Sequence, residues 1–98
     1  MDLYTVADAE SVVARARSGD EGALEELYRA FEIPVYNLAR RICRTTEDAE
    51  DVLQETWIAA VAALGGFRGD ASFRTWLTGI AINRCRVLLR KQIGRAHV

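Results

Sequence analysis

Apolar residues recur three and four positions apart along most of the chain, which is the period of an amphipathic α-helix. The pattern predicts a short helix over residues 8–17, a second helix after Asp20, and two long ones over residues 46–64 and 72–91. Ala, Leu, Arg and Glu are abundant, and β-branched residues seldom cluster. The predicted fold class is therefore all-α, a compact bundle of about four to five helices.

Breaks in this pattern predict where the helices begin and end. Asp20 is an expected N-cap, and Thr45 or Thr46 is expected to cap the third segment. Pro34 lacks a backbone donor and disfavours helix at Ile33, so the second helix should kink or break there.

The segment 46–64 has two contrasting sides. Its apolar side is expected in the core and comprises Ala49, Val52, Leu53, Thr56, Trp57, Ala60, Val61 and Leu64. The other side is densely polar, with Glu47, Asp48, Glu50, Asp51, Gln54 and Glu55. Acids near a helix N-terminus are favourable as a plain solvated surface. A docking surface for a basic partner is the other interpretation, and periodicity alone leaves both open.

A glycine-bearing loop should connect this segment to the last helix. Gly65 and Gly66 are expected to end the helix through left-handed conformations, and Ser72 is expected to cap the next one. The residues between them, Phe67, Arg68, Gly69, Asp70 and Ala71, have backbone amides that helices do not all consume. The loop can be an ordinary connector, or it can accept a base edge or a phosphate oxygen.

The last helix combines an apolar face with side chains that suit nucleic acid. Phe73, Leu77 and Ile80 mark the apolar face, and Trp76 can serve the core, stack on an unpaired base, or do both. Asn can contact adenine with two hydrogen bonds, and Arg can bind guanine or phosphate. These polar residues are Arg74, Asn83, Arg84, Arg86, Arg90 and Lys91.

Charge divides the chain into two parts. Residues 1–64 carry 13 acids and 6 bases, whereas residues 65–98 carry 1 acid and 7 bases, so the net charges are −7 and +6. The total of −1 conceals this asymmetry, which suggests two partners of opposite character.

Composition excludes several other classes of function. A chain of 98 residues allows one domain, and it contains neither a signal-peptide pattern nor a long apolar run, so we expect a cytoplasmic protein. Cys43 and Cys85 lack metal-site spacing and should be buried thiols. There is no Walker loop, paired zinc-ligand motif or Ser/His/Asp set, so neither catalysis nor a cofactor is expected.

Three motifs together resemble a known family. Asp51-Val-Leu-Gln-Glu, Phe67-Arg-Gly-Asp-Ala-Ser-Phe-Arg-Thr-Trp-Leu and Ile80-Ala-Ile-Asn resemble the promoter-melting domain, sigma-70 region 2, of bacterial extracytoplasmic-function (ECF) sigma factors. The resemblance covers about residues 8–92. It implies a transcription initiation factor that binds RNA polymerase and recognises and melts the minus-ten promoter element, with an anti-sigma factor as a possible further partner.

The resemblance also assigns roles to individual positions. Asp51, Gln54 and Glu55 match the motif that docks on the clamp coiled coil of the polymerase β′ subunit. The loop of residues 67–71 matches the element that captures a flipped base of the non-template strand. Asn83 matches the position that contacts the upstream edge of the minus-ten element. Trp76 would pack beside unpaired bases, and the arginines would follow the phosphates.

The chain departs from the family pattern in places. Val87 stands where an Asp is common, and Gly79 and Ile80 replace the tryptophan pair of primary sigma factors. Residues 93–98 match a peptide that a common sequencing adapter would encode in one frame, so we expect a domain over 1–92, a non-native tail over 93–98, and a natural protein that was longer. The competing hypothesis is a helical protein-interaction module without nucleic-acid binding; salt-dependent binding to single-stranded DNA would separate the two.

Overall fold

A computed structural model of the chain describes residues 6–96 and contains, within them, four α-helices and one short 3₁₀-helix. The α-helices are α1 (Val6–Arg17), α2 (Glu21–Ile42), α3 (Thr46–Ala63) and α4 (Phe73–Ala96), and the 3₁₀-helix η1 spans Leu64–Gly66. No strand occurs in this part of the chain. The prediction of an all-α bundle with four to five helices is confirmed.

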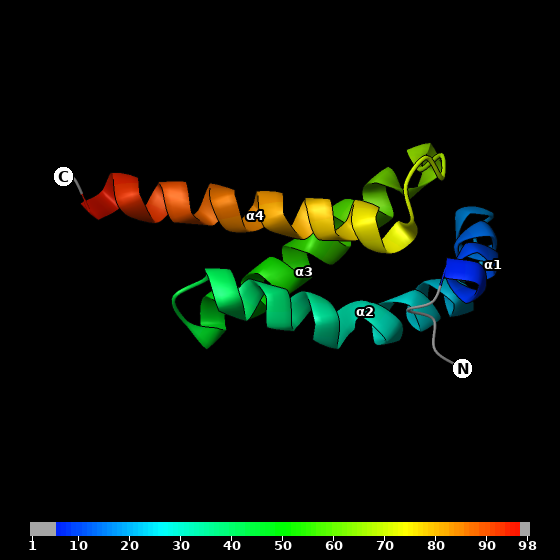
Figure 1. Ribbon diagram of the computed structural model, residues 1–98, viewed down its shortest axis with the longest axis horizontal. Helices are drawn as coiled ribbons and strands as arrows, with labels where there is room; N and C mark the ends of the chain where they lie inside the picture. The colour runs from blue at the N-terminus through cyan, green and yellow to red at the C-terminus, as the bar shows by residue number, and fades with distance from the viewer. Residues whose placement is uncertain (1–5, 97–98) are drawn as a thin grey trace.

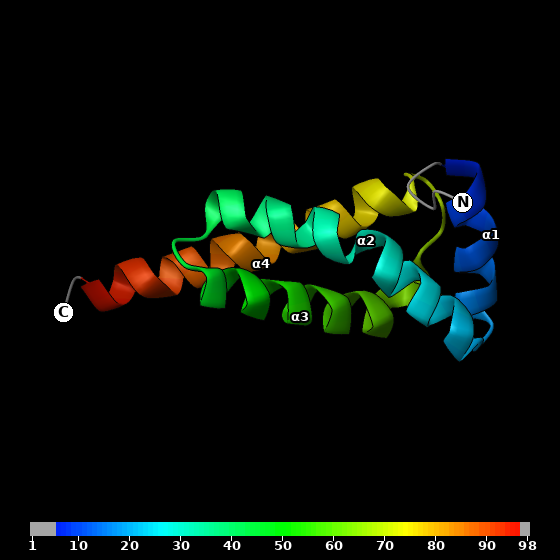
Figure 2. The same cartoon turned by 90° about the horizontal axis from the view of Figure 1, so that it is seen from below.

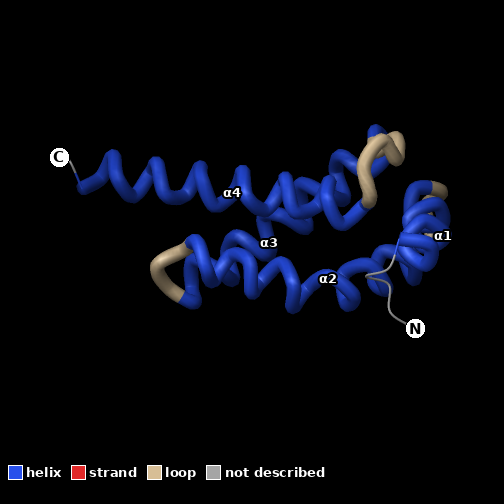
Figure 3. The backbone as a smooth tube through the Cα atoms, in the orientation of Figure 1, coloured by secondary structure: helices blue, strands red, loops and turns tan. Residues whose placement is uncertain are grey.

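The three long helices α2, α3 and α4 pack on one another, and α1 lies across one end of them (Figures 1 and 2). The connection between α3 and α4 lies at this same end, beside α1 (Figure 3). The last turns of α4 project beyond the opposite end of the bundle (Figure 2). The molecule measures 48 × 25 × 22 Å, and its elongated shape follows the direction of the long helices.

Side-chain caps define the helix starts as the sequence predicts. The Asp20 carboxylate accepts from the Ala23 amide at 3.2 Å, and the Thr45 hydroxyl accepts from the Asp48 amide at 3.0 Å. The hydrogen bond from the Ala23 amide, with that from Arg15, lowers the pKa of Asp20 below its usual value. Each cap satisfies a backbone donor that has no partner within its own helix.

Helix α2 continues through Pro34, so of the two predicted outcomes, a kink or a break, the break does not occur. Figure 2 shows that α2 bends along its course without interruption, which is the weaker of the two expected effects. Phe31 and Val35 flank the proline, and both side chains are buried in the core. Burial of these side chains offsets the lost hydrogen bond, because tertiary packing supplies most of the stability of a helix in a protein.

The end of α3 differs from the sequence prediction. Neither Gly65 nor Gly66 has a positive φ; within residues 6–96 only Gly19 and Gly69 do, at 100° and 80°. The helix narrows instead into η1, and the Phe67 amide closes it by donating to the Leu64 carbonyl at 3.0 Å. A 3₁₀ turn is a common way to satisfy the last carbonyls of a helix.

The main core forms where α1, the N-terminal and middle turns of α2, the end of α3 with η1, and the start of α4 meet. Leu27 and Leu77 are each 1% exposed, and the Phe31 and Phe73 rings meet edge to face at 5.3 Å. Val61, predicted in the core stripe of α3, is instead 41% exposed. Ala60 and Leu64 of the same stripe stay buried, so Val61 lies at the edge of the stripe.

A second, smaller core cluster contains both cysteines. The Cys43 and Cys85 sulfurs lie 3.9 Å apart, and both side chains are buried as predicted. Burial, with a smaller contribution from the neighbouring Cys43 thiol, raises the pKa of Cys85 to about 12. Cys85 therefore stays a neutral thiol, and the two buried side chains pack the C-terminal end of α2 against α4.

Candidate nucleic-acid and protein interfaces

The predicted loop is present between η1 and α4. Its first residue, Phe67, anchors the loop by packing into the core. Phe67 is only 9% exposed, and its ring lies 5.9 Å from that of Phe73 and 5.1 Å from that of Trp76. The sequence groups Phe67 with the residues that contact DNA, but the structure places its ring in the core. Its position holds the remainder of the loop at the surface.

The other loop residues predicted to contact DNA, Arg68, Gly69, Asp70 and Ala71, are exposed. Between described residues, no backbone hydrogen bond is donated from this stretch. The left-handed conformation of Gly69 turns the chain back toward α4. At the end of the loop the Ser72 hydroxyl accepts from the Thr75 amide at 3.1 Å, which confirms the predicted N-cap. The loop thus presents backbone donors that a ligand can use.

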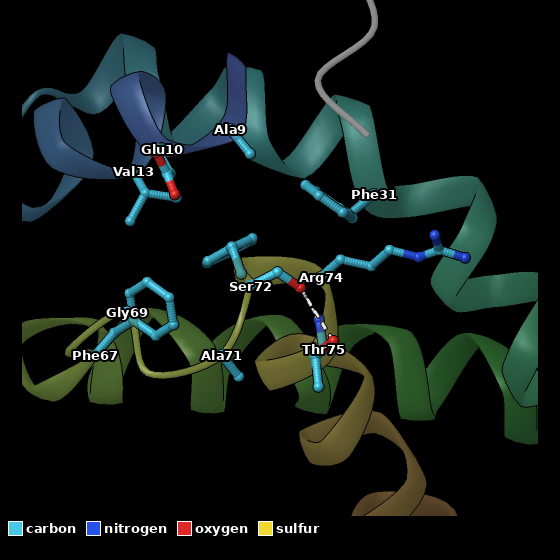
Figure 4. A pocket seen from close by; sticks show the side chains of 11 residues that line it. Ala9, Glu10, Val13, Phe31, Phe67, Gly69, Ala71, Ser72, Arg74 and Thr75 are labelled. Carbon is cyan, nitrogen blue, oxygen red and sulfur yellow. Dashed lines mark hydrogen bonds between the residues drawn. The ribbon is translucent and has the colours of Figure 1, made fainter. Parts of the chain in front are cut away.

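A pocket of about 240 Å³ opens between this loop and α1 (Figure 4). Phe31 from α2 and the two loop-end aromatic rings Phe67 and Phe73 contribute apolar walls. Glu10 and Val13 project from α1 toward the loop (Figure 4). Sequence reasoning missed the α1 residues, because tertiary packing alone brings residues 9–13 next to residues 67–75. The complete lining comprises Ala9, Glu10, Val13, Phe31, Phe67, Gly69, Ala71, Ser72, Phe73, Arg74 and Thr75.

The outer side of α4 carries most of the predicted polar contacts. Asn83, Arg86 and Arg90 are exposed at helical spacings of three and four, so they share one face. Arg84 differs, because it is half-buried and its Nε has no partner among the described residues. Trp76 is also half-buried and packs on two aromatic neighbours, so it combines a core contact with an accessible edge.

A groove of about 370 Å³ lies between α2 and α4, next to Arg74. Asn37 and Arg41 of α2 and Thr78 of α4 give it polar edges over an apolar floor that includes Leu77. Figure 4 shows the Arg74 side chain extending along α2, away from Glu10. Arg41 lies in the last turn of α2, and its approach to α4 is not visible in the sequence. No spacing rule could have found it, since the two edges come from different helices.

The polar side of α3 forms an exposed face opposite its core stripe. Asp51, Gln54 and Glu55 are all exposed, and Ile58 continues the same face one turn later with 68% of its surface exposed. We call these four residues the α3 docking face. This exposed isoleucine gives one end of the face an apolar contact surface that the charge pattern alone does not predict.

The α3 docking face and the polar face of α4 point away from a shared core. Helices α3 and α4 pack along their length, and the Gln92 amide donates to the Asp48 carboxylate at 2.8 Å. Gln92 therefore belongs to the bundle, while α4 continues to Ala96. The boundary at residues 92 and 93 stays a prediction, and His97 lies outside the described residues.

Comparison with protein families matches residues 13–93 to Sigma-70 region 2. The matched segment contains the loop, the polar face of α4 and the α3 docking face. Of the residues that line the pocket, Ala9 and Glu10 lie before it.

Curated relatives agree with this match. The chain is 39% identical over 90 residues to the ECF RNA polymerase sigma factor SigM of Mycobacterium tuberculosis H37Rv, covering 92% of this chain and 44% of SigM. It is 37% identical over 84 residues to the RNA polymerase sigma-H factor of Pseudomonas aeruginosa PAO1, covering 86% and 44%. The chain thus spans less than half the length of these two relatives.

Two solved structures have the same fold. An engineered region 2 of sigmaE, determined by NMR in complex with GTAAAA, superposes with a TM-score of 0.80 at 33% identity, covering 90% of this chain and 92% of that one. CnrH in complex with the cytosolic domain of CnrY superposes with a TM-score of 0.72 at 31% identity, covering 86% and 58%.

Proposed function

The chain belongs to the Sigma-70 region 2 family, and on this premise we propose that it is the part of an ECF sigma factor that binds core RNA polymerase and recognises and melts the minus-ten promoter element. The observation that carries the proposal is the likeness over nine tenths of the chain to a sigmaE region 2 that was solved with GTAAAA. This role is one of binding and strand opening rather than catalysis.

The polar face of α4 and the loop would hold the non-template strand. Asn83 would read a base at the upstream edge, and Arg86 and Arg90 would contact phosphates. Arg68 and Arg74 are exposed near the loop, so positive charge is available along the length of the site. Single strands bind such surfaces through phosphate contacts combined with base stacking.

The pocket beside the loop would take a base that has left the duplex. Aromatic and aliphatic walls favour a nucleobase there, and stacking contributes roughly 1–3 kcal/mol per base. That energy offsets part of the cost of unpairing, so capture of a flipped base favours the open strand. Phe67 is largely buried, and its ring would contribute to the apolar wall of this pocket.

The α3 docking face would bind the clamp coiled coil of the polymerase β′ subunit. Its acids suit a basic partner, and Ile58 offers apolar contact area within the same face. Interfaces of this kind commonly combine a desolvated apolar centre with charged contacts around it. The acidic part of the chain would thus hold polymerase, and the basic part would hold the opened strand.

An anti-sigma factor is a further expected partner. CnrH, whose fold the chain shares, was solved with the cytosolic domain of CnrY, which supports this expectation. No helix in residues 6–96 is long and apolar enough to cross a lipid bilayer. We expect the chain to act in the cytoplasm, where polymerase and promoter DNA are found.

Asn83 is exposed on the polar face of α4, where its side-chain amide can contact a base. We expect Asn83→Ala to weaken binding of the chain to GTAAAA by about fivefold to tenfold and to remove most of the preference for one upstream base, because a good amide–base pair contributes roughly 1–3 kcal/mol of discrimination. Fluorescence anisotropy at low salt, with hexanucleotides altered at one position at a time, measures both effects.

Arg90→Ala is the matched comparison on the same helix face. It should weaken binding to every sequence alike and reduce the salt slope, because a phosphate contact carries no sequence information. An Asn83→Ala variant that loses the same factor for every hexanucleotide would contradict the reading role of Asn83.

A further inference from the structure

Glu10 stands at the pocket beside the loop, where an acidic residue is unexpected in a site for DNA. None of the hydrogen bonds and salt bridges between described residues involves its carboxylate, and Figure 4 shows the side chain directed from α1 toward the loop. A carboxylate repels the phosphates of a strand that binds nearby. An unpaired acid at this position therefore weakens binding unless it contacts something other than phosphate.

We propose that Glu10 selects the base that enters the pocket, by accepting a hydrogen bond from a base that carries an exocyclic amino group and disfavouring thymine. This inference rests on the proposed function, since it requires that the pocket receives a base. It assigns a specificity-determining role to α1, outside the loop and helix that the sequence motifs indicate.

The size of the pocket limits the occupant. Its volume of about 240 Å³ lies below the roughly 300–1,000 Å³ of pockets that take drug-sized ligands. Rings and aliphatic groups form much of the lining, from Val13 on one side to Phe67 and Phe73 on the other. These features suit one flat, weakly polar group, such as a single nucleobase stacked against apolar walls.

The polar groups of the pocket determine which base fits best. A carboxylate has only acceptor oxygens, so it favours the amino groups of adenine, cytosine or guanine. Thymine has carbonyl oxygens on both sides of its one ring N–H and has no amino group. Its carbonyl O4, which occupies the position of an amino group in cytosine, would face the Glu10 carboxylate acceptor to acceptor. The Thr75 and Ser72 hydroxyls lie on the loop side and bond to each other at 3.0 Å.

The experiment first locates the flipped base and then tests the role of Glu10. Substituting 2-aminopurine for each adenine of GTAAAA in turn identifies the position at which its fluorescence changes most when the chain binds. Replacing that base by thymine should weaken binding to the wild-type chain about tenfold, as expected for loss of one hydrogen bond to a charged group. In Glu10→Ala the same replacement should weaken binding no more than about twofold.

Glu21→Ala serves as the control for charge alone, since Glu21 is exposed on α2 and lies outside the pocket lining. Glu21→Ala should bind all hexanucleotides slightly more tightly because one negative charge is gone, and it should keep the ratio between bases. Glu10→Ala should lose affinity chiefly for the hexanucleotide with the amino-bearing base at the flipped position, so only this variant should change the ratio. An unchanged ratio in Glu10→Ala, with binding intact, would overturn the role of Glu10 and leave the proposed function standing. Absence of binding to every hexanucleotide, with or without core polymerase, would overturn the proposed function and this inference with it.

Discussion

Replacing both Asp51 and Glu55 by lysine is expected to reduce the affinity of the chain for core RNA polymerase by at least about 100-fold. Both side chains are exposed on the α3 docking face, and loss of one partner from a close charged contact at an interface costs roughly 2–5 kcal/mol. Reversal adds repulsion to that loss. The measurement is a binding titration of labelled chain with core polymerase.

The fold should tolerate this double substitution. Asp51 and Glu55 already form a like-charged pair four residues apart, and two lysines keep that relation on the same helix. Glu21→Lys with Glu25→Lys on α2 makes the same change of net charge at another exposed pair with the same spacing, and should leave polymerase affinity within about threefold. Equal losses in the two double variants would show that overall charge, rather than the α3 docking face, controls binding.

Leu77→Ala is expected to have the largest effect on stability. The side chain is 1% exposed in the main core, and removing a buried leucine costs roughly 2–5 kcal/mol in the free energy of unfolding. A domain of this size has a total stability of only about 5–15 kcal/mol. We therefore expect the midpoint of thermal unfolding, followed by circular dichroism, to fall by at least about 10 °C.

Ile58→Ala supplies the contrast, because it removes a comparable apolar side chain that is 68% exposed. Its unfolding midpoint should shift by no more than about 3 °C, since exposed substitutions usually change stability by less than about 0.5 kcal/mol. Its affinity for polymerase should nevertheless fall, because Ile58 lies within the α3 docking face. A similar loss of stability in both variants would contradict the burial pattern described above.

Local chemistry made the helix starts predictable. Asp20, Thr45 and Ser72 each bond an amide three residues later, an interaction between near neighbours that the sequence displays directly. The continuation of α2 through Pro34 was harder to predict from the sequence. Whether a proline interrupts a helix depends on how much stability the neighbouring side chains gain by packing in the core. Phe31 and Val35 pack against residues from distant parts of the chain, which the local sequence does not reveal.

The candidate site likewise contains features that follow from local sequence and features that follow only from tertiary packing. Their spacing within one helix places residues 51, 54 and 55 on the same exposed face, so the sequence alone predicts this face. The polar face of α4 is predictable for the same reason. The burial of Phe67, the exposure of Val61 and the approach of Glu10 to the loop could not be predicted from the sequence. Each of them depends on which helices meet at one end of the bundle, and spacing within one segment carries no information on that.

The most direct test of the account is the salt dependence of promoter-strand binding in the presence of core polymerase. With about four phosphate contacts, the affinity of a labelled single strand containing GTAAAA should fall about 50-fold between about 50 and 200 mM salt, and binding should require the chain. Fluorescence anisotropy with polymerase, with and without the chain, gives this slope. Binding that does not depend on the chain, or that is insensitive to salt, would contradict the account and favour a helical protein-interaction module without nucleic-acid binding.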